Sequence, residues 1–136
     1  MTTGYSGTPL AKKLGIKDGF DLLTVNAPDN YLDLLDPMPA KVTISDATRN
    51  GVDLVHLFSN GRDELFGKLA QCVRLIKQDG TIWTSWYKKA AKLPSEITED
   101  TVREAAFPLG LVDIKGCAVD EKWSGLKLVI RKENRI

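Results

Sequence analysis

Polar side chains follow directly after several apolar, β-prone runs of the sequence, and they are the residues best placed to bind a ligand. In an open α/β sheet such positions gather at one edge, because the carboxyl ends of parallel strands meet there. The chemistry they offer is hydrogen bonding through amides and hydroxyls, with one carboxylate and one amine. The candidate ligand-binding residues are Asn26, Pro28, Asp46, Ser59, Asn60, Ser85 and Lys88.

A single histidine and two cysteines limit the acid–base, nucleophilic and metal chemistry. His56 lies between Val55 and Leu57, a position typical of a buried histidine bonded to a neighbour rather than of a catalytic base. Cys72 falls on the apolar face of a predicted helix and Cys117 inside a predicted strand, as small core residues do. We therefore assign no catalytic residue and expect neither a metal site nor a disulfide, as in a reducing compartment.

Aromatic and basic residues are interleaved near the middle of the chain. Trp83, Trp86 and Tyr87 are followed by Lys88 and Lys89, and this composition could stack on bases while neutralising phosphates. Strand alternation, however, sends the two tryptophans to opposite faces, so at least one belongs to the core. With 19 Lys and Arg against 18 Asp and Glu, the net charge of +1 also argues against a nucleic-acid or anionic-membrane partner.

The length of 136 residues fits one domain, which we place at 1–136. Residues 1–7 form a polar N-terminal arm, residues 8–15 a short helix with Thr8 as cap and Pro9 in its first position, and residues 22–131 the α/β core. The chain shows no signal-peptide h-region and no apolar run of membrane-spanning length. We expect a cytoplasmic protein with no membrane association.

The first half of the core reads as three strands, over residues 22–25, 42–44 and 54–58. Asp29 is predicted to cap a short helix between the first two strands, and the unit they form would be a right-handed parallel crossover. The link between the second and third strands is short, so the sequence leaves open whether those strands run parallel or antiparallel.

The second half begins with the clearest helix of the chain, whose apolar spacing runs from Leu65 to Ile76. Asn60 is its predicted cap and Asp79-Gly80 its exit, before a strand over residues 81–86. These features place the apolar stripe of the helix against a sheet.

A second helix begins after Thr98, its predicted cap, with Ile97 and Val102 spaced as a hydrophobic staple. Strands over residues 111–119 and 126–130 then form an antiparallel hairpin. The order of elements predicts a three-layer, Rossmann-like α/β fold, with a mostly parallel sheet of about six strands and an antiparallel C-terminal hairpin.

The stretch from Asp53-Leu54-Val55 through the long helix to Asp79-Gly80-Thr81-Ile82-Trp83 and the final hairpin resembles the second half of a class I S-adenosylmethionine-dependent methyltransferase. The resemblance implies a cofactor site built on a Gly-rich turn after the first strand, with an acidic residue after the second. Here Asn26-Ala27-Pro28-Asp29 replaces the Gly-rich turn, while Asp46 stands at the acidic position. We expect no cofactor, and S-adenosylmethionine only in an altered pocket.

Two further segments, residues 4–16 and 118–127, look like those of a family of small bacterial proteins known only as domain of unknown function 3052. This resemblance implies a bacterial cytoplasmic protein and brings no activity with it.

The interpretation that these observations favour is a non-catalytic or vestigial methyltransferase-like domain that binds a small ligand or a protein partner. One alternative is an enzyme with an atypical S-adenosylmethionine or nucleotide pocket at the strand carboxyl ends, with Asp46, Ser85 and Lys88 as the groups to test. The other is a module that binds single-stranded nucleic acid.

Overall fold

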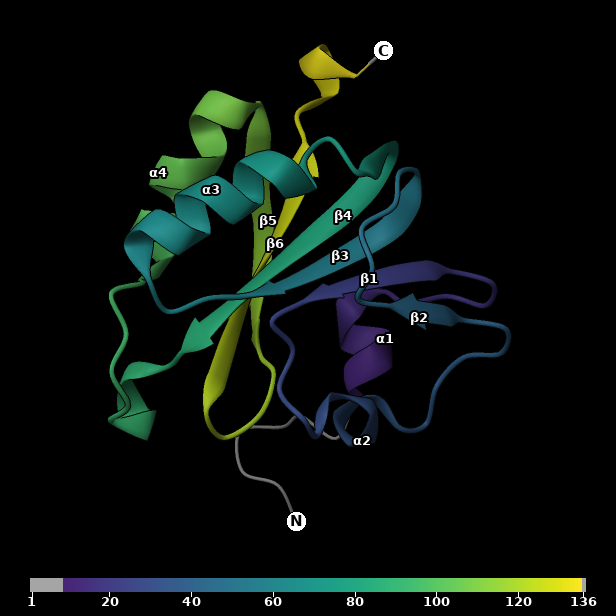
Figure 1. The fold of residues 1–136 in the computed structure, drawn as a ribbon, viewed down its shortest axis with the longest axis horizontal. Coiled ribbons are helices and arrows are strands. Elements are labelled where there is room, and N and C mark those ends of the chain that lie inside the picture. The colour runs from purple at the N-terminus through teal and green to yellow at the C-terminus, as the bar shows by residue number, and fades with distance from the viewer. Residues whose placement is uncertain (1–8, 136) are drawn as a thin grey trace.

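A computed structural model describes residues 9–135, and its centre is one six-stranded sheet (Figure 1). The strands lie in the order β2-β1-β3-β4-β6-β5; the first four are parallel, and β6 runs antiparallel to both β4 and β5. This arrangement confirms the predicted α/β fold class with its antiparallel C-terminal hairpin. The strands are β1 (Asp21–Val25), β2 (Thr43–Ser45), β3 (Val52–Phe58), β4 (Ile76–Tyr87), β5 (Leu111–Ala118) and β6 (Trp123–Ile130).

Helices cover both faces of the sheet. On one face α3 and α4 lie side by side, and on the other α1 and α2 lie together near β1 (Figure 1). The α-helices are α1 (Leu10–Leu14), α2 (Tyr31–Leu35), α3 (Arg62–Cys72) and α4 (Glu99–Ala106), and short 3₁₀ turns span Lys89–Ala91, Phe107–Leu109 and Lys132–Asn134. The predicted arm over residues 1–7 and the predicted cap Thr8 lie outside the described residues.

The position of β1 between β2 and β3 answers the question that the short second link left open. Leu22 pairs with Ile44 on one side and with Leu54 on the other, and both ladders are parallel. A parallel return normally needs a long crossover. Because β2 has only three residues, residues 46–51 are enough to bring the chain back to the start of β3 without a helix.

Alternation along the strands divides the core into two layers. Leu23 and Val55 point toward α3 and α4, where the core is largely aliphatic. Leu22, Leu54 and Phe58 point toward α1 and α2, where the core is rich in aromatic rings. Both faces of β1 and β3 are therefore buried, as expected of the central strands of a parallel sheet.

The long helix is shorter than its apolar spacing predicts. It ends at Cys72, and the backbone N–H of Leu75 donates to the Cys72 carbonyl in the turn that follows. Ile76, predicted as the last residue of the helical stripe, is instead the first residue of β4, and Asp79-Gly80 lies within an irregular part of that strand. A buried apolar residue four positions after Cys72 satisfies the helical period by coincidence, so periodicity alone misplaces the boundary.

Three predicted helix starts also move by one residue. Gly61, not Asn60, is the N-cap of α3, because the Asn60 side chain accepts a hydrogen bond from the Tyr87 backbone instead (2.7 Å). Asn30, not Asp29, is the N-cap of α2, and Pro9 precedes α1 rather than opening it. For Asn60 the reason is this tertiary contact, and the other two boundaries differ from the prediction by a single position.

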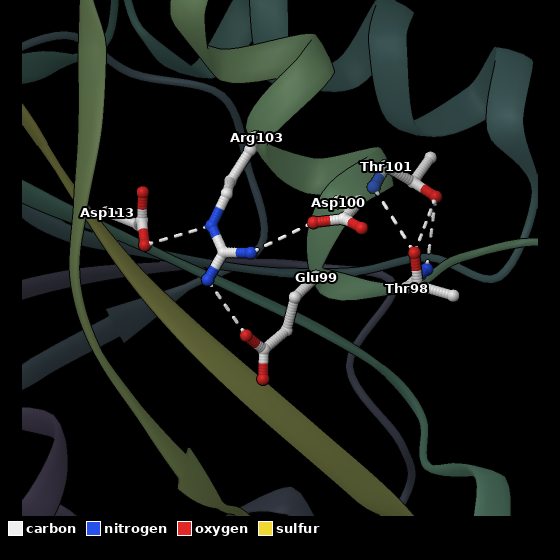
Figure 2. A network of polar contacts seen from close by, with 6 residues as sticks. All are labelled: Thr98, Glu99, Asp100, Thr101, Arg103 and Asp113. Atoms are coloured by element: carbon white, nitrogen blue, oxygen red, sulfur yellow. Dashed lines mark hydrogen bonds and ion pairs between the residues drawn. The ribbon is translucent and has the colours of Figure 1, made fainter.

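The start of α4 follows the sequence prediction. The Thr98 hydroxyl accepts from the Thr101 backbone N–H, and the Thr101 hydroxyl accepts from the Thr98 backbone N–H, which closes a capping box (Figure 2). Ile97 and Val102, the predicted staple, are both buried. The cap and staple thus fix the helix start through local sequence.

Further along α4, Arg103 holds the helix to the edge of the sheet. Its guanidinium donates to Asp113 on β5 and to Asp100 and Glu99 on its own helix, at 2.9–3.2 Å (Figure 2). The guanidinium is half-exposed, so this network orients α4 more than it stabilises the fold.

Candidate functional site

The crevice between the carboxyl ends of β1 and β3 is the first place to look for a ligand. After β1 the chain crosses on the α2 side, and after β3 it crosses on the α3 side, so the crossovers diverge between these two strands. Such a switch point is where open α/β sheets bind ligands. In this protein the Asn26 side chain spans it, donating from Nδ2 to the Phe58 carbonyl at 3.3 Å.

Polar groups of the crevice are engaged with one another. The buried Ser59 hydroxyl donates to the Glu64 carboxylate (2.7 Å), and Asn60 accepts from the Tyr87 backbone. The space that remains has a volume of about 350 Å³ and is shallow. Asn26, Ser59 and Asn60, three of the predicted residues, meet here, but their side chains bind neighbouring groups of the chain.

A larger groove opens on the α3 side of β1. Its volume is about 870 Å³, and its walls are β1, the loop of residues 46–50 and the second half of α3 with the turn that follows. The return from β2 to β3 carries no helix, so this side of the sheet lacks a helix beyond α3. Asn26 and Asp46 are the predicted residues that line it.

The side chains of β2 show that the groove side of the sheet is suited to contact with water. Ser45 pairs with Leu23, and Thr43 with Asp21, so both hydroxyl residues point to the same side as Leu23, toward the groove. Ile44 points to the opposite, covered side, beside Leu22. The strand is therefore apolar where the sheet is covered and polar where it is open.

The groove lining combines an apolar floor with long polar side chains. The half-buried Val25 and Leu75 supply apolar surface, above the buried Leu23 and Cys72. The polar side chains that sequence reasoning missed are Thr48, Asn50, Lys68, Gln71 and Arg74. The alternation of residues 43–45 and the lack of a helix after that strand were the only signals in the sequence that could have pointed to them.

An ion-pair chain fastens the loop of residues 46–50 to the sheet. Arg49 binds Asp21 at 2.7 Å, the Asp21 backbone N–H donates to Asp53 at 2.8 Å, and Lys77 binds Asp53 at 2.8 Å. Burial opposes ionisation of Asp53, but the Asp21 amide and the Lys77 ammonium outweigh it and hold the pKa of Asp53 below its usual value. One wall of the groove is thus held by tertiary contacts.

The remaining predicted residues lie away from both spaces. The Pro28 carbonyl accepts from the Tyr31 backbone at the start of α2, and the Lys88 backbone donates to the Lys122 carbonyl in the hairpin turn. Ser85 is fully buried inside β4. The expectation that Ser85 lies in an open cleft together with Asp46 and Lys88 is wrong, because its side chain points into the core beneath α2.

In that core Ser85 belongs to a buried polar line. The Tyr31 hydroxyl lies 2.8 Å from His56 Nδ1, and the Ser85 hydroxyl lies 2.8 Å from His56 Nε2. Burial lowers the pKa of His56 to about 3 and raises the pKa of Tyr31. The prediction of a core histidine bonded to a neighbour is confirmed. The order Ser-His-Tyr looks like a catalytic relay, but all three side chains are enclosed by protein.

The two tryptophans of the aromatic segment are core residues. Trp83 Nε1 donates to the Leu14 carbonyl (2.8 Å) under α1, and Trp86 packs beneath α3 and α4. Neither ring offers a face on which a base could stack. The nucleic-acid alternative therefore loses two of the three aromatic rings on which it was based, and only Tyr87 stays partly exposed.

Metal, thiol and membrane chemistry find little support among the described residues. Within residues 9–135 no three His, Cys, Asp or Glu side chains gather as metal ligands, and no helix has the length and apolar character needed to cross a bilayer. Burial raises the pKa of the Cys72 thiol to about 11 and also raises that of Cys117. Neither thiol is activated as a nucleophile.

Solved structures with a similar fold include S-adenosylmethionine-dependent methyltransferases. A S-adenosylmethionine-dependent methyltransferase from Aquifex aeolicus is 16% identical with a TM-score of 0.69, covering 89% of this chain and 87% of its own. A TehB-like enzyme from Corynebacterium glutamicum is 15% identical (TM-score 0.59; 94% and 90% covered). Aeropyrum pernix fibrillarin with natively bound S-adenosyl-L-methionine is 10% identical (TM-score 0.60; 93% and 70% covered).

These likenesses establish a methyltransferase-like, Rossmann-type fold. The chain itself belongs to the protein family of unknown function DUF3052, whose family model matches residues 35–132. No curated protein matches the sequence significantly.

The resemblance to the methyltransferases implies a turn after β1 that binds S-adenosylmethionine. The turn in this protein does not fit that cofactor. That resemblance calls for glycine backbone lying against the cofactor, whereas here Asn26 adopts the left-handed conformation (φ 60°) and closes the crevice with its own side chain. Pro28 offers no N–H to a ligand. Asp46 does stand at the end of β2, but it is exposed on the groove. We therefore derive no methyl-transfer step.

Proposed function

We propose that this protein is a non-catalytic, methyltransferase-like domain that binds a small ligand in the groove between β1, the loop of residues 46–50 and α3. The observation that carries the proposal is the contrast between two adjacent spaces. The switch-point crevice is spanned by the Asn26 side chain, while the groove beside it has about 870 Å³ of open space, a volume typical of small-molecule sites.

The absence of catalytic function is supported by the state of the chemical groups near the crevice. Glu64 is held by Ser59, and His56, the only histidine, is buried and kept neutral by its surroundings. A general acid or base must reach a substrate proton within hydrogen-bonding distance. His56 has no such access, and the exposed Glu64 carboxylate at the crevice already accepts a hydrogen bond from Ser59.

A small ligand is favoured over a protein partner by the chemistry of the open face. A docking helix would require apolar residues pointing out of β2, but Thr43 and Ser45 occupy those positions. The groove instead offers amides, hydroxyls and charges around a limited apolar floor, which suits a compact polar molecule.

Native mass spectrometry of protein purified without added ligand tests this proposal. We expect a bound small molecule, and we expect its occupancy to fall in Asn50→Ala, whose side chain lines the groove. Asn30→Ala is the matched control, because that exposed asparagine at the start of α2 makes no side-chain cap bond.

A thermal-shift titration with S-adenosylmethionine tests the other part of the proposal, that the crevice does not bind the methyltransferase cofactor. We expect no rise in Tm, because the crevice does not present the required turn. Copurification with S-adenosylmethionine, or stabilisation by it, would show that the cofactor site is intact. Protein that carries no small molecule and is stabilised by none in a broad metabolite panel would overturn the ligand proposal.

A further inference from the structure

Building on the proposed function, we infer that the ligand of this groove carries a carboxylate or phosphate group and that Lys68 and Arg74 bind it. Both residues line the same wall of the groove, Lys68 from α3 and Arg74 from the turn that follows the helix. The inference concerns the charge of the ligand, which the proposed function leaves open.

Arg74 differs from the other arginines of the described chain in having no partner for its guanidinium. Arg49, Arg62 and Arg103 each form an ion pair with a carboxylate. Arg131 lies over the Phe107 ring and near Glu133, and Arg135 donates to the Ile130 carbonyl. Within residues 9–135 only the Arg74 guanidinium makes no such contact, and it lies at the groove.

Lys68 adds a second cation to the same wall. It is half-buried along α3, and no carboxylate among residues 9–135 lies within ion-pairing distance of it. A guanidinium presents a planar fork that matches the oxygens of a carboxylate or phosphate, and an ammonium nearby adds a point charge. The groove wall thus carries two cations without a carboxylate partner, and we infer that both engage the anionic group of the ligand.

The opposite wall has the opposite character. Asp46 and Thr48 come from the loop of residues 46–50, with Asn50 beside them. A carboxylate and neutral hydrogen-bonding groups suit the hydroxyl or amine of a ligand. The groove is therefore bipolar: the anionic end of the ligand would lie against the α3 wall and its donor groups against the loop wall, over the apolar floor of Leu23 and Val25.

Cations near a helix C-terminus also favour the helix dipole, so the test must measure binding rather than stability. The experiment is an NMR titration of ¹⁵N-labelled protein with inorganic phosphate in one arm and citrate in the other, at constant ionic strength set with sodium chloride. We expect saturable shifts confined to the amides of residues 46–50 and 68–75, and the arm with the tighter binding identifies phosphate or carboxylate as the preferred group.

Variants separate a built site from general attraction to positive charge. Lys68→Gln combined with Arg74→Gln should weaken the binding of the better probe at least tenfold, whereas Lys122→Gln, in the exposed hairpin turn, should not change it. Shifts scattered over surface lysines without saturation, or equal binding by the double variant, would overturn the inference.

Failure of this inference can be told apart from failure of the proposed function. If native mass spectrometry shows a neutral or cationic molecule whose occupancy is unchanged in the Lys68→Gln/Arg74→Gln protein, the groove binds a small ligand but the anion assignment is wrong. If no small molecule binds at all, the proposed function fails with it.

Discussion

The two faces of the sheet use polar residues in opposite ways. On the α1/α2 face, Tyr31, His56 and Ser85 form a line of hydrogen bonds sealed beneath aromatic rings. On the α3/α4 face the buried core is largely aliphatic, and long polar side chains line the groove beside β1, where no helix covers the sheet.

This difference shows that a strongly shifted pKa does not mark the functional site of this protein. Shifted pKa values and a Ser-His-Tyr order are usual signs of an active site. Here the shift of His56 results from complete burial within a satisfied network, which is a structural role. The groove, whose groups are accessible and have hydrogen-bonding capacity to spare, is the better candidate for binding.

The strongest test of the comparison is His56→Ala. Removing the imidazole leaves the Tyr31 and Ser85 hydroxyls without their partner and opens a cavity, so the free energy of unfolding should fall by about 3 kcal/mol or more. Urea denaturation followed by fluorescence measures it. Tyr31→Phe, which keeps the ring, should cost about 1–2 kcal/mol.

Wild-type stability in His56→Ala would show that the buried line is not structural. Loss of a groove ligand from a well-folded Tyr31→Phe protein would contradict the separation of the two faces, because it would show that the α1/α2 face affects the binding site.

A smaller effect is expected from pH. The folded protein resists protonation of His56 until about pH 3, whereas the unfolded chain takes up that proton near the ordinary value of 6.5. This contribution to stability is complete above pH 6.5 and declines as the pH falls from 6.5 toward 3. The slope should be up to about 1.4 kcal/mol per pH unit.

Urea titrations at pH 7.5, 6.5 and 5 measure this decline. The window lies above the range in which Asp53 titrates, since the pKa of that carboxyl is lowered from 3.8. Imidazole signals that titrate near pH 6.5 in the folded protein would contradict the burial of His56.

The smallest effect is expected at the covered part of the α3/α4 face. Thr98→Ala removes the hydroxyl half of the capping box and should lower the free energy of unfolding by about 1 kcal/mol, and Thr98→Ser should restore most of it. The amide signals of residues 46–50 should stay unchanged, because α4 packs away from β1 and β2 (Figure 1). Shifts at that loop would show that the covered and open parts of this face are coupled.

Much of the fold could be predicted because its signals are local. The short apolar runs of residues 22–25 and 54–58 indicate buried strands, and Thr98 with Ile97 and Val102 indicates a helix start. Local signals fail where two structures share one pattern. Ile76 fits a helical stripe and a strand equally well, and the ladder with Val52 assigns it to the strand.

The candidate site was less accessible from the sequence. Asn26 and Asp46 could be selected because each follows a strand, and both line the groove. Ser85 was selected because it lies near the carboxyl end of a predicted strand, but its side chain points into the core, where its hydroxyl is the partner of His56 on the neighbouring strand. No feature of the neighbouring sequence distinguishes Lys68 and Arg74 from the other lysines and arginines of the chain.

The sequence by itself determined the order and type of the strands and helices, the core histidine and the absence of a Gly-rich turn, since each depends on residues within a few positions of one another. The tertiary structure decided that β1 lies between β2 and β3, that Asn26 spans the crevice, and that an open groove remains beside α3. These outcomes depend on contacts between segments 20 or more residues apart, for which the entropy of chain closure and the packing of the whole sheet, rather than local preference, determine the result.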